Sequence, residues 1–105
     1  MIEVQILDFD WDEGNQGKCQ KHGLALAEIE VFFRQEQIFI TPDIKHSQTE
    51  QRFLAMGQSP LGKPMFVVFT LRGQAAKQFI RPISARYMHQ REVQKYEQEI
   101  ARLNK

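Results

Sequence analysis

The chain has 105 residues, of which 42% are hydrophobic and 10% aromatic, and it carries a formal net charge of +1. This length fits a single domain over residues 1–105, and the apolar fraction is too high for a disordered chain. The single cysteine, Cys19, excludes an intramolecular disulfide. No apolar run is long enough to span a membrane, and the first ten residues, MIEVQILDFD, lack the basic start of a signal peptide. We therefore expect a cytoplasmic protein.

The first third of the chain predicts one strand and one short helix. Apolar and polar residues alternate over residues 2–9, which is typical of a strand. Asp12 or Asn15 can cap a helix that continues through residue 20, and Gly23 suits its C′ position.

A second helix and a short strand follow. Residues 24–34 place apolar side chains at helical spacing on one face, and residues 37–41 form a β-type run that Pro42-Asp43 stops. The face of the second helix consists of Ala25, Ile29, Phe32 and Phe33.

The middle of the chain predicts a hairpin. A strand over residues 51–58 and another over residues 64–71 are joined by the turn residues 59–62, which contain Pro and Gly. The second of these strands is apolar on both faces, so we expect it to be the central strand.

The last third predicts a turn, a strand and a helix. Arg72-Gly73 begins the turn, residues 78–84 form the strand, and Pro82 places that strand at an edge or a bulge. From His89 onward the chain is helical. The element order predicts an α+β fold: a mostly antiparallel sheet of about four to five strands, with the N-terminal helices and a C-terminal helix packed on it.

Charge is divided unevenly along the chain. Residues 1–50 contain ten acids and four bases, which gives −6, and residues 51–105 contain three acids and ten bases, which gives +7. Either the two halves neutralise each other in the folded protein, or the second half binds an anionic partner.

Two polar clusters in the first half of the chain are candidates for chemistry. Lys21-His22 closes the first helix, where the helix dipole favours cations and where an imidazole is also suited to proton transfer. The polar stretch 43–47, followed by Glu50 and Arg52, is either a solvated loop with a local ion pair or a means of directing Arg52 at an anion.

A third cluster surrounds the end of the last strand. Guanidinium groups there can hold a phosphodiester through paired donors, or they can pair with the acidic half of the chain. Tyr87 and Trp11 can stack on bases, although we expect Trp11 in the core. The three histidines and Cys19 lack the spacing of metal ligands, so no metal and no cofactor is expected. The cluster comprises Arg81, Ser84, Arg86, Tyr87 and Arg91.

Several short motifs follow one another in order along most of the chain. They are Asp10-Trp11-Asp12-Glu13, Lys21-His22-Gly23, Phe32-Phe33, Asp43 to Ser47 with Glu50, Arg52 and Phe53, Met56-Gly57-Gln58-Ser59, Val67-Val68-Phe69-Thr70 with Arg72, Arg81-Pro82-Ile83-Ser84-Ala85-Arg86, and Arg91-Glu92 with Tyr96. This ordered set resembles the motifs of the BrnT-type toxin family. The last helix departs from the family pattern, because His89 stands where a Ser or Thr usually completes a capping box with Glu92.

The resemblance implies a RelE-like fold and metal-free cleavage of RNA. It also implies neutralisation by a BrnA-like antitoxin with a ribbon-helix-helix domain, in a complex that binds operator DNA. In such a reaction the RNA supplies its own 2′-hydroxyl as nucleophile, so the enzyme moves protons and stabilises the phosphorane-like transition state.

Roles within this reaction are assigned as a hypothesis, in which folding brings the groups into a single pocket. Arg52 and Arg86 stabilise the phosphate, with Arg81 near them, and Ser84 orients an oxygen. His22 donates or accepts a proton, with assistance from Lys21. Glu50 is a second candidate base, and Tyr87 and Arg91 contact the RNA.

Two other interpretations remain. One is a non-catalytic module that binds an antitoxin and operator DNA, which is distinguished by RNA binding without cleavage. The other is a structural protein with no nucleic-acid role, which would show no salt-dependent affinity for RNA.

Overall fold

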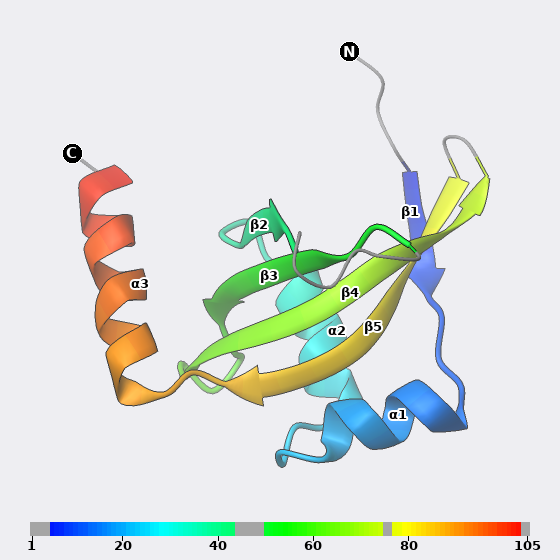
Figure 1. Cartoon of the computed structure of the whole chain (residues 1–105), viewed down its shortest axis with the longest axis horizontal. Coiled ribbons are helices and arrows are strands. Elements are labelled where there is room, and N and C mark those ends of the chain that lie inside the picture. Colours follow the sequence, from blue (N-terminus) through cyan, green and yellow to red (C-terminus); the bar gives the residue numbers. More distant parts are fainter. Residues whose placement is uncertain (1–4, 44–49, 75–76, 104–105) are drawn as a thin grey trace.

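The computed structural model describes residues 5–43, 50–74 and 77–103, and it has the predicted α+β fold (Figure 1). Part of the polar stretch expected after Asp43, residues 44–49, lies outside the described residues. The strands are β1 (Gln5–Phe9), β2 (Phe39–Pro42), β3 (Phe53–Gln58), β4 (Pro64–Gln74) and β5 (Lys77–Tyr87), and the helices are α1 (Glu13–Gln20), α2 (Leu26–Arg34) and α3 (Gln90–Leu103). No helix in this part of the chain is long and apolar enough to cross a membrane.

The five strands form one sheet in the order β1-β5-β4-β3-β2. β1 runs parallel to β5 and the other pairs are antiparallel, so the predicted mostly antiparallel sheet is confirmed. β4 is the central strand, as its apolar run indicates. It extends to Gln74, so the turn predicted at Arg72-Gly73 is wrong: Gly73 stays in the ladder opposite Gln78.

The core lies between α2 and one face of the sheet, and α2 is behind the sheet in Figure 1. Ile29 and Phe32 of α2 are fully buried, as are Met65 and Val67 at alternate positions of β4. Gly57 of β3 is required here, because a Cβ at this position would lie 3.0 Å from the Phe32 ring. The alternation of strand side chains leaves the opposite face of the sheet uncovered by α2.

A bulge in β5 determines which side chains reach the open face. Val68 pairs with Ser84 and Phe69 with Pro82, so Ile83 is an extra residue on β5. The prediction of a bulge at Pro82 is confirmed, whereas its alternative, an edge strand, is wrong because β5 lies between β1 and β4.

α1 lies beside β5 where β1 has ended (Figure 1). Asp12 caps this helix and Asn15 completes a capping box, so both candidate caps take part. Lys21 is the C-cap, and Gly23, with a φ of +91°, stands one position beyond the predicted C′ site. Trp11 packs against the core as expected, and its indole N–H donates to Glu30 at 2.9 Å.

α3 stands at the end of the sheet where β4 begins and β5 ends (Figure 1). It contacts the sheet region through Tyr96, which is buried and meets the Phe39 ring edge-on at 6.3 Å, and through Glu92. The capping box of this helix is half present, as the sequence indicates: the Glu92 carboxylate accepts from the backbone N–H of His89 at 2.8 Å.

Candidate active site

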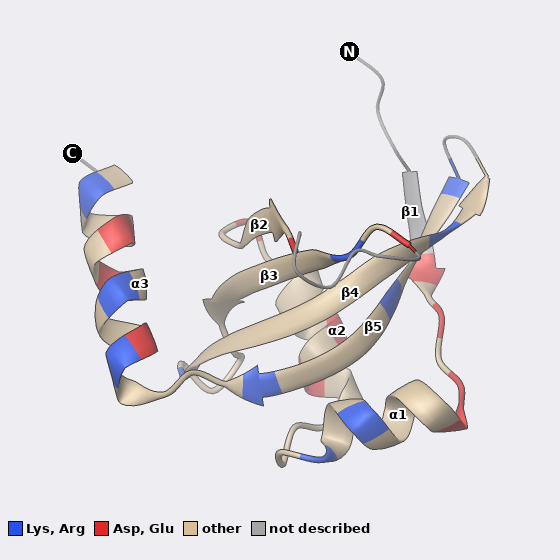
Figure 2. Cartoon of the chain, in the orientation of Figure 1, with Lys and Arg blue, Asp and Glu red and all other residues tan. Residues whose placement is uncertain are grey.

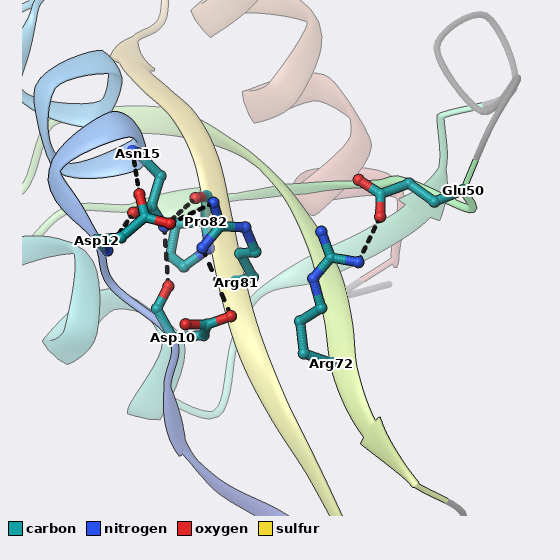
Figure 3. Close-up of polar contacts among 7 residues, drawn as sticks. All are labelled: Asp10, Asp12, Asn15, Glu50, Arg72, Arg81 and Pro82. Atoms are coloured by element: carbon teal, nitrogen blue, oxygen red, sulfur yellow. Dashed lines mark hydrogen bonds and ion pairs between the residues drawn. The ribbon is translucent and has the colours of Figure 1, made fainter.

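One buried amide fixes α1 against β5. The Asn15 side chain is 4% exposed, and its Nδ2 donates to the carbonyl oxygens of Asp10 and Pro82, each at 2.8 Å (Figure 3). Its Oδ1 accepts from the backbone N–H of Asp12 at 2.7 Å. These bonds hold the start of the helix near the β5 bulge, so the residues after the helix are carried alongside the second half of β5.

A first cavity, of about 340 Å³, lies between the end of α1 and the open face of the sheet. His22 lines it from the helix side, and Ser84 and Arg86 line it from β5. The apolar side chains around them belong to β3, β4 and β5, and Glu92 comes from α3; they are Leu54, Phe66, Val68, Ala85 and Glu92. An imidazole, a hydroxyl and a guanidinium therefore share one cavity.

Arg86 is held in this cavity mainly by Glu92 and Phe66. Its two terminal nitrogens each donate to a Glu92 carboxylate oxygen at 2.8 Å, and its guanidinium lies 4.9 Å from the centre of the Phe66 ring. The hydrogen bond from Arg86 is the main reason why the pKa of Glu92 falls to about 2, and the same bond raises the pKa of Arg86. The pair makes the first cavity nearly neutral.

A second cavity, of about 280 Å³, lies at the other end of α1. Lys18 lines it from the helix, Arg81 from β5 and Arg72 from β4, and Arg52 and Glu50 line it just before β3. Gly14, Asn15 and Ile83 complete its wall. Figure 2 shows basic positions on α1 and on β5.

The carboxylates at this end come from the acidic half of the chain (Figure 3). Arg72 donates to Glu50 at 2.6 Å, and a Glu50 oxygen lies 3.9 Å from Nε of Arg52. Arg81 contacts Asp12 at 2.9 Å and Asp10 at 3.5 Å. The pKa of Asp12 is lowered, first by the backbone N–H of Asn15 and then by Arg81.

The structure divides the expected single pocket into two cavities on one face. His22, Ser84 and Arg86 line the first cavity, whereas Glu50, Arg52 and Arg81 line the second. The remaining predicted residues line neither cavity. Lys21 is exposed at the end of α1, Arg91 is exposed on the first turn of α3, and the Tyr87 hydroxyl donates to Glu28 of α2 at 2.6 Å.

Two cationic residues of the second cavity were not predicted from the sequence. Lys18 is an exposed cation of α1, and no local pattern in the sequence distinguishes it from other exposed helix cations. Arg72 was assigned to a turn, and only the longer β4 places it on the open face. Among the described residues, no three His, Cys, Asp or Glu side chains are grouped in a way that could hold a metal ion.

Comparison with known proteins agrees with the resemblance of the motifs. A family model described as the ribonuclease toxin, BrnT, of type II toxin-antitoxin systems matches residues 11–92, which is most of the chain. The match includes every residue that lines the two cavities. No curated protein matches the chain.

Proposed function

The chain belongs to the BrnT family of ribonuclease toxins of type II toxin-antitoxin systems, and from this premise we propose that it cleaves RNA without a metal ion at the first cavity. One observation carries the proposal: His22, Ser84 and Arg86 line the same cavity, which is open to solvent on the uncovered face of the sheet. These side chains offer a proton carrier and phosphate ligands in the same place.

In the proposed reaction the RNA attacks itself. The 2′-hydroxyl oxygen bonds to the adjacent phosphorus and loses its proton, while the bond from phosphorus to the 5′-oxygen breaks and that oxygen gains a proton. The products are a 2′,3′-cyclic phosphate and a 5′-hydroxyl. His22 carries one of the two protons, Arg86 neutralises the charge on the phosphate oxygens, and Ser84 donates a hydrogen bond to one of them.

The test is cleavage of a single-stranded RNA oligonucleotide by the purified protein in the presence of EDTA. We expect His22→Ala and Arg86→Ala each to lower the rate by about two orders of magnitude, the usual scale for removing a proton carrier or a charge-stabilising donor. His89→Ala is the matched control, because His89 is an exposed histidine that lines neither cavity. Full activity in both cavity variants would refute the assignment.

We also propose that the partner is a BrnA-like antitoxin with a ribbon-helix-helix domain, that the complex binds operator DNA, and that the free toxin inhibits translation in the cytoplasm. A type II system pairs its toxin with a protein antitoxin, and this supports the first statement. Expression with and without the neighbouring gene tests the proposal. We expect growth arrest and loss of intact RNA only without that gene, and a stable complex with it.

The non-catalytic module remains the second candidate, and one observation favours it. Both terminal nitrogens of Arg86 are already bonded to Glu92, so a phosphate has to share or displace that carboxylate. This candidate predicts salt-dependent binding of RNA with no cleavage, with or without EDTA.

A further inference from the structure

We propose that the second cavity is a phosphate-binding subsite for single-stranded RNA, which supplies affinity by holding a phosphate of the strand a few nucleotides away from the bond cleaved in the first cavity. This inference rests on the proposed function in taking RNA as the ligand. It assigns to Lys18 and Arg72 a role that the motifs do not give them, and it moves Arg52 and Arg81 from the reacting phosphate to another phosphate of the same strand.

The charges of the two cavities differ. Four cationic side chains and one carboxylate line the second cavity, and Asp10 and Asp12 pair with Arg81 beside it, which leaves a net of +1, whereas Arg86 and Glu92 cancel in the first. Neutralising phosphates is the main source of affinity for a nucleic-acid backbone. The first cavity alone therefore has little attraction for RNA, and the second has the charge to provide it.

Three cations of the second cavity retain donors for a ligand, namely Lys18, Arg72 and Arg81. Arg72 donates to Glu50 through one nitrogen, and Arg81 uses its two terminal nitrogens for Asp10 and Asp12, although a guanidinium has five N–H groups. Lys18 is exposed, and its ammonium has no partner in the part of the chain that the structure describes. A phosphate oxygen can therefore bind without every ion pair being broken.

The floor between the cavities is apolar, which suits a base rather than a phosphate. The bulge places Ile83 in the wall of the second cavity and Ser84 in that of the first, and Val68 and Leu54 lie beside Ser84. Unpaired bases rest on apolar and aromatic side chains, whereas the bases of a duplex are stacked inside it. The alternation of cations, apolar floor and reaction groups favours a single strand.

The separation of the cavities also excludes a shared phosphate. Arg81 and Arg86 are five positions apart on β5, and with one residue taken up by the bulge this is roughly 13 Å of strand. The rise per nucleotide in a stacked strand is about 3.4 Å. At this rise, roughly 13 Å corresponds to about four nucleotides, so in the proposed complex the two arginines contact phosphates of different nucleotides.

The experiment measures binding of a fluorescent 2′-O-methyl RNA hexanucleotide, which has no free 2′-hydroxyl and cannot be cleaved by the proposed reaction. We expect Lys18→Gln and Arg72→Gln each to raise Kd about tenfold, and Arg72→Lys to restore part of the affinity. Each Gln variant should also lower the slope of log affinity against log salt by about 0.7, the value for one phosphate contact on a single strand.

The matched control is Lys95→Gln, which removes one exposed positive charge from α3, outside both cavities. Thermal unfolding shows whether each variant is folded. If Lys18→Gln and Arg72→Gln bind the hexanucleotide as Lys95→Gln does, the subsite is refuted and the cluster is an internal ion-pair network only.

The outcomes for the two proposals are distinct. If binding requires Lys18 and Arg72 but RNA with a free 2′-hydroxyl is not cut, the subsite stands and the nuclease proposal is refuted. If the protein cuts such RNA, and its affinity for the hexanucleotide is unchanged by substitution of Lys18 or Arg72, the nuclease proposal stands and the subsite is refuted.

Discussion

Replacing Asn15 with Ala tests whether one amide fixes α1 to the sheet. The change removes three side-chain hydrogen bonds, two donated to the carbonyls of Asp10 and Pro82 and one accepted from the N–H of Asp12. At about 1 kcal/mol net for each bond, less roughly 0.5 kcal/mol regained from the helix preference of Ala, the loss is about 2.5 kcal/mol. Urea unfolding should show it as a midpoint lower by roughly 2 M.

Two further variants make this prediction sharp. Gln16→Ala is the control, because the Gln16 side chain makes no hydrogen bond within the described residues. Asn15→Asp puts a carboxylate against two carbonyl oxygens, which raises its pKa in the folded protein. It should therefore be less stable than Asn15→Ala at pH 7 and recover as the pH falls, when the acid regains a donor. A loss in Asn15→Ala within about 0.5 kcal/mol of the control would refute the reasoning.

Four other substitutions or measurements test separate features. Arg86 lowers the pKa of Glu92 from its usual value of 4.5 to about 2. The Glu92 carboxylate therefore stabilises the folded protein above pH 4.5, and this stabilisation is lost as the pH falls toward 2. Glu92→Gln should thus be about 1 kcal/mol less stable than wild type at pH 7 in urea titrations, and the two should converge near pH 2. Gly73→Ala places a Cβ 2.2 Å from a carbonyl oxygen of the facing strand at a φ of +129°, and should lose about 2 kcal/mol or more in thermal unfolding. Gly17→Ala, a helix position with open space around it, should gain about 1 kcal/mol in the same assay, and a loss there would contradict the prediction. Burial raises the pKa of the Cys19 thiol to about 11, so iodoacetamide at pH 8 should alkylate it roughly a hundredfold more slowly in the folded protein than in urea.

Local chemistry made most of the fold predictable. Asp12 and Asn15 carry capping side chains, Pro82 lacks the donor that a regular ladder needs, and the Pro and Gly of residues 59–62 form the hairpin turn. Each of these signals acts within a few residues of its own position. Gly73 failed as a turn signal because its place in the ladder depends on the opposite strand, to which a Cβ at this position would come too close.

The site was predictable as a set of residue types but not as an arrangement. Arg81 meets Asp12 from 69 residues away and Arg72 meets Glu50 from 22, so no local pattern could show which cations are neutralised. The two interpretations of the charge asymmetry also stand together. Carboxylates of the first half pair with three arginines of the second, while the second cavity still has an excess of positive charge.

The relation between the two cavities depends on one short helix. Lys18 lies in the last turn of α1 and His22 follows its C-cap, and they line different cavities. Asn15 holds the start of this helix to the carbonyl of Pro82, next to the residue that the bulge adds to β5. The bulge assigns Ile83 to the second cavity and Ser84 to the first, so β5, like the segment from α1 to His22, contributes to both cavities. The spacing between a held phosphate and a reacting one therefore depends on β5 and on where α1 ends, so a substitution that loosens α1 should impair cleavage even where it removes no group that contacts RNA.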